Sequence, residues 1–179
     1  MIKKLIYKIT YPGITLGSKP SIEKNCILIS TSTYGNKNTS IGNNCLIRSG
    51  SIIYPGNILG HNFTTGNNVN IRENNIIGDN VSIGTGSIIE HSVEIGNNVR
   101  IHSGAFIPEY SVIEEGAWIG PRVVITNSKY PARENSKELL SGVTISKRAV
   151  IGANVTLLPG ITIGPNAIIG AGSVVTKDV

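Results

Sequence analysis

The sequence is poor in aromatic residues, cysteine and long apolar runs, and each of these shortages argues against a class of protein. Its 179 residues include two phenylalanines, one tryptophan and two cysteines. Cys26 and Cys45 both lie in strand-like segments, which predicts small core residues rather than a disulfide or a metal site. No segment is long and apolar enough to span a bilayer. Residues 1–8 mix charged and apolar residues and lack the apolar core of a signal peptide. We therefore expect a cytoplasmic protein with no membrane partner.

The charged residues give a mildly basic protein without a basic run. The formal net charge is +5 and the isoelectric point is about 9.3. Because no basic run is interleaved with aromatic residues, we expect no nucleic-acid partner. The excess of positive charge would suit a phosphate-bearing small ligand, but surface charge without a binding role is the simpler explanation.

The dominant feature of the sequence is a six-residue repeat of aliphatic residues, broken in its first run only by Thr65. Helices repeat near 3.6 residues and strands near 2, so a sustained period of six is typical of a solenoid. The residue two positions earlier is usually small or branched, which predicts a short strand with one large and one small inward side chain. The repeat positions are Ile41, Ile47, Ile53, Leu59, Thr65, Ile71, Ile77, Ile83, Ile89, Ile95, Ile101, Ile107, Ile113, Ile119 and Ile125, then Ile145, Ile151, Leu157, Ile163, Ile169 and Val175.

Glycine and asparagine gather directly after the repeat positions, as in Ile41-Gly42-Asn43-Asn44. Both residue types tolerate left-handed backbone angles, which predicts corners between strands. Three units would close a triangular coil of about 18 residues, with neighbouring coils about 4.8 Å apart. The narrow interior of such a prism accepts few rings, which accounts for the scarcity of aromatic residues. The sequence therefore predicts an all-β parallel solenoid that forms a single domain over residues 1–179.

The repeat is interrupted once, between Ile125 and Ile145. The intervening residues, about 126–142, are polar and contain Pro131, so they cannot continue a strand in register and should leave the solenoid as a loop. Long loops on a rigid scaffold often carry function. A tolerated insertion is the alternative.

The repeats, the loop and the C-terminal sequence resemble the hexapeptide-repeat acyltransferases that acetylate sugars on nitrogen or oxygen. The resemblance rests on the Ile-Gly repeats, on residues 151–155 (IGANV) and on residues 169–179 (IGAGSVVTKDV). It implies a left-handed β-helix and a homotrimer with active sites between subunits. It also implies acetyl-CoA bound along the last coils. The residues that match positions lining the pantetheine arm and the phosphates are Ala153, Ala171, Thr176 and Lys177.

The loop departs from the family's pattern at one position. Sugar O-acetyltransferases of this family carry a catalytic histidine directly before a proline of the loop, whereas here Tyr130 precedes Pro131. An amine presents some free lone pair near neutral pH, but a sugar hydroxyl depends more on a base. The missing histidine therefore favours an amino acceptor. By resemblance, we expect a nucleotide-linked amino sugar used in surface glycan synthesis, with sugar O-acetylation as the alternative.

A replacement base is predicted from residues spaced one coil apart in the sequence, which should stack at one corner. Glu73, His91, Glu109 and Asn127 form such a series and end where the loop leaves. Flanking carboxylates would orient the imidazole, so we expect His91 with Glu109 to act in catalysis and Asn127 and Glu73 to contact the acceptor. A solvated corner column is the alternative. The segment 88–91 (IIEH), followed by Ile-Gly, is also similar to the catalytic-histidine segment of the family's amino-sugar N-acetyltransferases.

His102 and Arg122 are weaker candidates for the site. His102 falls between Gly84 and Gly120 in the series of positions one coil apart, which would leave room for a ligand, so it is a second candidate base. Arg122 is near the same corner and is a candidate for acceptor binding, although surface packing explains it equally well.

Two other functions of such a solenoid remain as minor alternatives. A zinc carbonic anhydrase would need three converging histidines, but His61, His91 and His102 are expected on three different corners. We therefore predict no metal site. A non-catalytic solenoid of the ice-binding kind would need regular threonine arrays, which the sequence lacks, and it would not need the loop.

Overall fold

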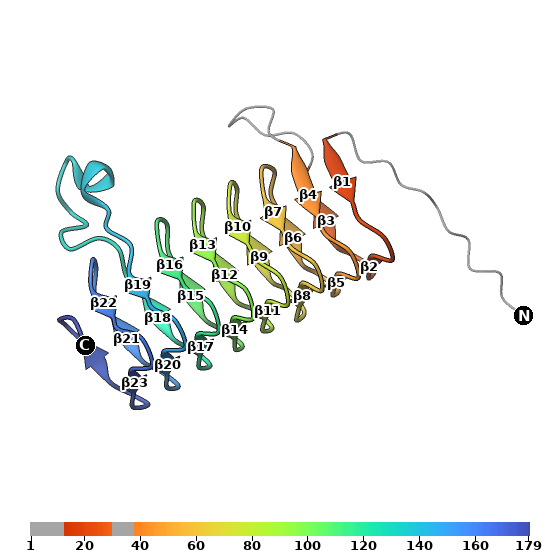
Figure 1. Ribbon diagram of the computed structural model, residues 1–179. Helices are drawn as coiled ribbons and strands as arrows, with labels where there is room; N and C mark the ends of the chain where they lie inside the picture. Colours follow the sequence, from red (N-terminus) through yellow and green to blue (C-terminus); the bar gives the residue numbers. More distant parts are fainter. Residues whose placement is uncertain (1–12, 30–37) are drawn as a thin grey trace, which may run out of the picture.

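The chain winds into a left-handed parallel β-helix in the computed structural model, which describes residues 13–29 and 38–179. Three sheets of eight strands form the sides of a prism, and the coils follow one another along its axis (Figure 1). Each strand pairs in parallel with the third strand after it, so that Ile76 lies opposite Glu94 of the next coil. The predicted fold class is confirmed, whereas the single-domain assignment for residues 1–179 stays a prediction.

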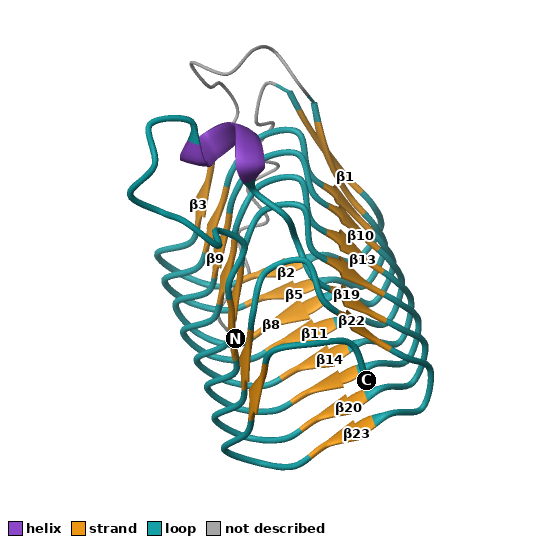
Figure 2. Cartoon of the chain, turned by 90° about the vertical axis from the view of Figure 1, so that its left-hand side faces the viewer, coloured by secondary structure: helices purple, strands orange, loops and turns teal. Residues whose placement is uncertain are grey.

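The three sheets, here called A, B and C in chain order, take every third strand (Figure 2). Sheet A contains β1 (Ile14–Leu16), β4 (Thr39–Ile41), β7 (Ile58–Leu59), β10 (Ile76–Ile77), β13 (Glu94–Ile95), β16 (Val112–Ile113), β19 (Thr144–Ile145) and β22 (Thr162–Ile163). Sheet B contains β2 (Ser21–Ile22), β5 (Leu46–Ile47), β8 (Thr64–Thr65), β11 (Ser82–Ile83), β14 (Arg100–Ile101), β17 (Trp118–Ile119), β20 (Val150–Ile151) and β23 (Ile168–Ile169). Sheet C contains β3 (Ile27–Leu28), β6 (Ile52–Ile53), β9 (Asn70–Ile71), β12 (Ile88–Ile89), β15 (Phe106–Ile107), β18 (Val124–Ile125), β21 (Thr156–Leu157) and β24 (Val174–Val175).

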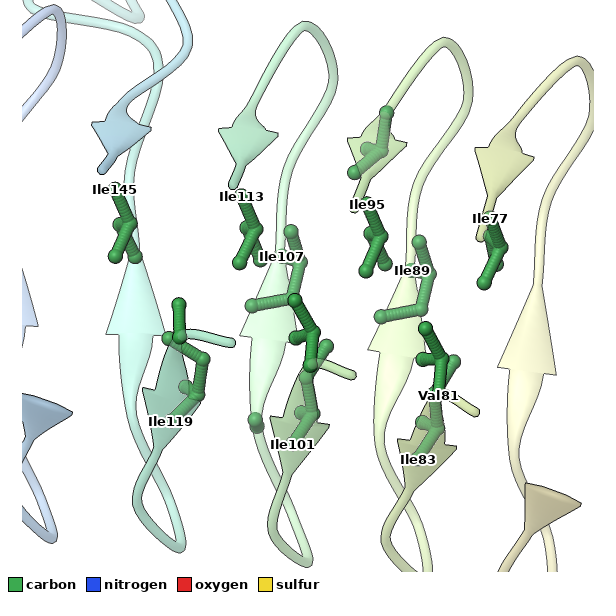
Figure 3. Close-up of a cluster of buried hydrophobic side chains, with 14 of the residues drawn as sticks. Ile77, Val81, Ile83, Ile89, Ile95, Ile101, Ile107, Ile113, Ile119 and Ile145 are labelled. Atoms are coloured by element: carbon green, nitrogen blue, oxygen red, sulfur yellow. The ribbon is translucent and has the colours of Figure 1, made fainter. Parts of the chain in front are cut away.

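The core is a set of aliphatic stacks inside the prism. The second residue of each two-residue strand points inward, and in the central coils it is almost fully buried, as at Ile83, Ile101 and Ile119. Figure 3 shows these side chains stacked on equivalent residues of neighbouring coils. Each buried isoleucine contributes about 1.5–3 kcal/mol relative to an exposed one. The six-residue period therefore records the inward positions, as the sequence predicts.

The corners use asparagine and glycine for two different reasons. Asn44, Asn62 and Asn80 have positive φ angles of 57°, 55° and 57°, and their side-chain amides hydrogen-bond from one coil to the next. The glycine after a repeat residue has another role, because a Cβ on Gly42 would lie 2.5 Å from the carbonyl carbon of Gly60. The corner positions are as predicted, but Gly42 provides close approach between coils rather than a left-handed angle.

Thr65, the exception in the aliphatic series, is explained by its neighbour Phe63. Phe63 is fully buried and fills the interior from the position that is small in most other coils. Thr65 is also buried, and its Oγ1 accepts a hydrogen bond from the amide of Arg48 at 2.9 Å. Large and small positions are thus exchanged in this coil, and the interior remains filled.

The interruption of the repeat leaves the solenoid as a loop between β18 and β19. Val112 pairs with Thr144 in the same way that Glu94 pairs with Val112, so the sheet register is kept although this coil contains the extra residues of the loop. The loop contains the 3-10 helix η1 (Ser136–Leu139). Its base is closed by a 2.8 Å hydrogen bond from the amide of Ser141 to the carbonyl of Asn127. Within residues 13–29 and 38–179, no helix is long and apolar enough to cross a membrane.

Candidate functional site

The corner between sheets C and A, here called the CA corner, carries the predicted column. It follows β9, β12, β15 and β18, and successive coils place Glu73, His91, Glu109 and Asn127 there. The loop departs immediately after Asn127. The predicted stacking is therefore present, and it positions a histidine two coils from the base of the loop.

His91 is partly exposed and contacts residues on both sides. Its Nε2 lies 3.8 Å from Oε1 of Glu109, with 32% of the side chain exposed. Its Nδ1 is 3.2 Å from Oγ of Ser92, and its ring packs edge-on against Tyr110. Oε2 of Glu109 accepts a 2.7 Å hydrogen bond from Nδ2 of Asn127. Glu109 therefore links the imidazole to the root of the loop and fixes its surroundings without covering it.

Glu73 is engaged by an arginine rather than by the histidine. Its carboxylate is buried and accepts hydrogen bonds from Nε of Arg72 at 2.9 Å and from Nη2 at 3.2 Å. Burial raises the pKa of Glu73, but the Arg72 hydrogen bonds and charge outweigh it and hold the pKa below its usual value. An occupied carboxylate has little capacity left for an acceptor, so the substrate-binding role of Glu73 stays a prediction without a supporting contact.

Arg72 organises the coils on the N-terminal side of His91. Its Nη1 lies 3.6 Å from Glu90, and its guanidinium lies over the Tyr54 ring at 4.9 Å. Burial raises the pKa of Glu90, although the nearby Arg72 charge acts in the opposite direction. The sequence analysis missed this cluster. Its signal was the regular spacing: Tyr54, Arg72 and Glu90 are one coil apart and form a column one residue before that of His91.

His102 and Arg122 lie on another corner, the BC corner between sheets B and C. The His102 ring packs on Trp118 at 4.5 Å between ring centroids. Burial, followed by the charge of Arg100, lowers the pKa of His102 and favours its neutral form. Arg122 is exposed, with its Cγ beside Gly104. One chain therefore does not bring His102 or Arg122 to the CA corner.

The third histidine, His61, lies at the corner between sheets A and B. Its Nδ1 accepts a hydrogen bond from the amide of Asn43 at 2.9 Å. Its own amide donates to Oδ1 of Asp79 at 2.6 Å. The three histidines thus occupy three different corners, as the sequence predicts, and these contacts give His61 a structural role.

The candidate cofactor residues lie on both edges of the last strand of sheet C. Ala153 and Ala171 stack on the BC corner, where the amide of Gly172 donates to the carbonyl of Ala153 at 2.8 Å. Thr176 and Lys177 follow β24 on the CA corner and are exposed. Lys177 therefore lies on the same corner as His91, four coils toward the C-terminal end, or about 19 Å along the axis.

Comparison with known sequences finds a family but no curated relative. Residues 76–109 and 142–177 match the bacterial transferase hexapeptide (six repeats). Residues 38–72 match the hexapeptide repeat of succinyl-transferase. Together these segments cover more than half of the chain. No curated protein matches the sequence significantly.

Solved structures share the fold at low sequence identity. UDP-N-acetylglucosamine acyltransferase from Arabidopsis is 20% identical, with a TM-score of 0.54 over 94% of this chain and 66% of that chain. The enzyme of that name from Bacteroides fragilis is 19% identical, with a TM-score of 0.56 over 100% of this chain and 68% of that chain. GDP-perosamine N-acetyltransferase from Caulobacter crescentus, in complex with CoA and GDP-perosamine, overlays less closely. It is 20% identical, with a TM-score of 0.39 over 80% of this chain and 50% of that chain.

The family matches agree with the six-residue repeat of the sequence. The chain spans about two thirds of the length of the acyltransferases from Arabidopsis and Bacteroides fragilis. The protein belongs to the hexapeptide-repeat transferase family of left-handed β-helices.

Proposed function

We propose that the protein is an acyltransferase that moves the acetyl group of acetyl-CoA to the amino group of a nucleotide-linked sugar. The observation that carries the proposal is the contact of His91 with Glu109, which in turn accepts a hydrogen bond from Asn127. A partly exposed imidazole held beside a carboxylate is suited to general base catalysis. Its place near the base of the only long loop among the described residues puts it where an acceptor can be held.

In the proposed reaction the acceptor amine attacks the thioester carbonyl and forms a C–N bond. His91 takes the proton that the nitrogen loses and returns it to the sulfur as the C–S bond breaks, so CoA leaves as its thiol. Glu109 stabilises the imidazolium that forms in the transition state. Backbone N–H groups of the coils are the candidate donors to the tetrahedral oxyanion. Asn127, at the root of the loop, is the candidate for holding the acceptor.

The C-terminal coils have side chains that fit acetyl-CoA. Ala153 and Ala171 are small, and a Cβ placed on Gly172 would meet no atom within 4 Å, so the backbone there is open to a ligand. Lys177 is exposed and forms no salt bridge with any residue in the described ranges, which leaves its charge for a phosphate. Thr176 offers a neighbouring hydroxyl. When bound there, acetyl-CoA would supply the activated acetyl group.

The arrangement of corners favours a site shared between subunits of a homotrimer. Ala153 and Ala171 lie on the BC corner, as do His102 and Arg122, whereas His91 lies on the CA corner. If the BC corner of one subunit lies beside the CA corner of the next, both sets of residues contribute to one site. In this arrangement His102 is the second catalytic candidate and Arg122 contacts the acceptor.

Sugar O-acetylation is the second candidate function, and the same pair, His91 and Glu109, supports it. A hydroxyl needs a base more than an amine does, and His91 with Glu109 supplies one. The loop position that carries the histidine of sugar O-acetyltransferases holds Tyr130, which packs under Arg133 with the guanidinium 4.0 Å from the ring centre. Tyr130 thus packs within the loop, and this position supplies no histidine base for a hydroxyl acceptor. We therefore retain the amine as the first choice of acceptor.

Calorimetric titration with acetyl-CoA tests the proposal. We expect micromolar binding by the wild type and binding weaker by about tenfold in Lys177→Ala, because a charge-assisted contact to phosphate is lost. The matched control is Lys137→Ala, which removes the same charge from the exposed loop. Absence of binding by the wild type would contradict the assignment of acetyl-CoA as the acyl donor.

A further inference from the structure

A groove crosses the outer face of sheet B, away from the CA corner. It has a volume of 330 Å³ and runs over strands β5, β8, β11 and β14. Its lining includes the arginines Arg48 and Arg100, His102, and the hydroxyl residues Thr64, Ser82 and Thr85. Of the residues given a role in the proposed reaction, only His102, the second candidate base, lines this groove.

The groove exists because small residues occupy two successive coils. On the strands, Thr64 and Ser82 lie between Leu46 and Arg100. On the BC corner, the corresponding positions are Gly66 and Gly84, which lie between Arg48 and His102 in the same series of coils. The bulky residues at the two ends are three coil spacings apart, or about 14 Å. The hollow is therefore built into the sequence rather than left by a loop.

The charges at the ends of the groove are positive and are not neutralised by a salt bridge. Arg48 and Arg100 are both exposed, and neither forms a salt bridge with any residue in 13–29 or 38–179. No aspartate or glutamate lines the groove. Two arginines that line a groove with hydroxyl side chains and glycines are suited to a doubly charged anion, because each guanidinium can donate two hydrogen bonds to a phosphate.

His102 adds a second, independent observation at the same place. Among the described residues, its Nε2 is a buried polar atom without a hydrogen-bond partner. Its ring lines one end of the groove and packs on Trp118. A buried unpaired nitrogen costs stability and is uncommon in a folded protein, so it needs an explanation. A small rotation of the ring toward the groove would expose this nitrogen to a polar group of a ligand at the His102 end, which would supply the missing partner.

We propose that this groove binds the 5′-diphosphate of a nucleotide ligand, with Arg48 and Arg100 on either side of the two phosphates. The His102 ring, which lines one end of the groove and packs on Trp118, offers a surface on which a nucleobase can stack. The inference deepens the proposed function and rests on it for the source of the ligand, since nucleotide-linked sugars and CoA both carry a nucleoside 5′-diphosphate. The binding itself is tested without any transfer assay.

Titration calorimetry of the protein with UDP, GDP and CoA tests this inference. We expect at least one nucleotide to bind, and Arg48→Gln and Arg100→Gln to weaken its binding by about tenfold or more each. Binding should also weaken as salt is raised. The matched control is Arg148→Gln at another corner, where the arginine Nε donates to Asn166 at 2.9 Å. This control should bind the nucleotide as the wild type does.

The outcomes separate the ligand sources and the two proposals. Loss of UDP or GDP binding in the arginine variants assigns the groove to the sugar nucleotide. Loss of CoA binding alone assigns it to the acyl donor and contradicts the placement of the CoA phosphates at Lys177. Wild-type affinity for every nucleotide in both arginine variants, or no nucleotide binding at all, would overturn the inference. His91→Asn should lower kcat for transfer by about 10²- to 10⁴-fold and keep nucleotide binding, so failure of the proposed reaction is distinguishable from failure of the groove.

Discussion

Replacing His91 by asparagine is expected to lower kcat for acetyl transfer by about 10²- to 10⁴-fold, because the reaction loses its general base. Asparagine is close to histidine in size and can hydrogen-bond with Ser92 and Glu109, so the fold should be retained. The Michaelis constant for acetyl-CoA should change little, since the proposed CoA contacts lie about three to four coils away. Steady-state kinetics with the wild type and the variant at one fixed pH measures both parameters.

Two companion variants sharpen this test. Glu109→Gln retains an acceptor for the Asn127 amide but removes the charge beside the imidazole. It should therefore reduce kcat less than His91→Asn does. His61→Asn is the matched histidine control, because His61 hydrogen-bonds within its own corner. Wild-type kcat in His91→Asn, or an equal loss in His61→Asn, would contradict a catalytic role for His91.

Replacing Phe63 by alanine should lower the free energy of unfolding by about 3–5 kcal/mol, among the largest losses for a single core residue. Phe63 is fully buried and fills a coil in which the repeat residue is the smaller Thr65. Truncation leaves a cavity that the neighbouring coils cannot fill, since their backbones are fixed by the sheet hydrogen bonds. Urea unfolding at one protein concentration, followed by circular dichroism, measures the loss.

The double variant Phe63→Val/Thr65→Ile is the matched control for this explanation. It restores the usual pattern of a small residue followed by a large one and conserves much of the interior volume, so the expected loss is about 1–2 kcal/mol. Part of that loss comes from the Arg48 amide, which no longer has Thr65 Oγ1 as acceptor. A double variant as unstable as Phe63→Ala would show that the exchange of large and small positions is not what fills this coil.

The fold was largely predictable because each coil repeats the same local rules. The inward positions, the corners and the loop all follow from the six-residue period, since a residue at Ile83 has the same surroundings as one at Ile101. What the period could not predict is how single coils compensate for exceptions. Phe63 and Thr65 exchange roles through side-chain volume, and Gly42 is needed for close contact between coils rather than for a backbone angle.

For the candidate site, the sequence predicted which residues share a corner but not which of them contact one another. The regular spacing of the coils placed Glu73, His91 and Glu109 on one corner, but it could not say which carboxylate contacts the histidine. That choice depends on Arg72, because its guanidinium forms a salt bridge with Glu73, whereas Glu109 lies beside His91. The spacing also does not predict the groove on sheet B, because a hollow arises from the absence of large side chains on two adjacent coils. Roles that need a neighbouring subunit remain predictions.

The most direct test of the proposed activity is the release of free CoA thiol from acetyl-CoA in the presence of a nucleotide-linked amino sugar. The matched compound with a hydroxyl at the position of the amine is the comparison acceptor. The proposed function predicts thiol release that requires the acceptor, is faster with the amine, and is lost in His91→Asn. Binding of acetyl-CoA without acceptor-dependent thiol release from either sugar would contradict it.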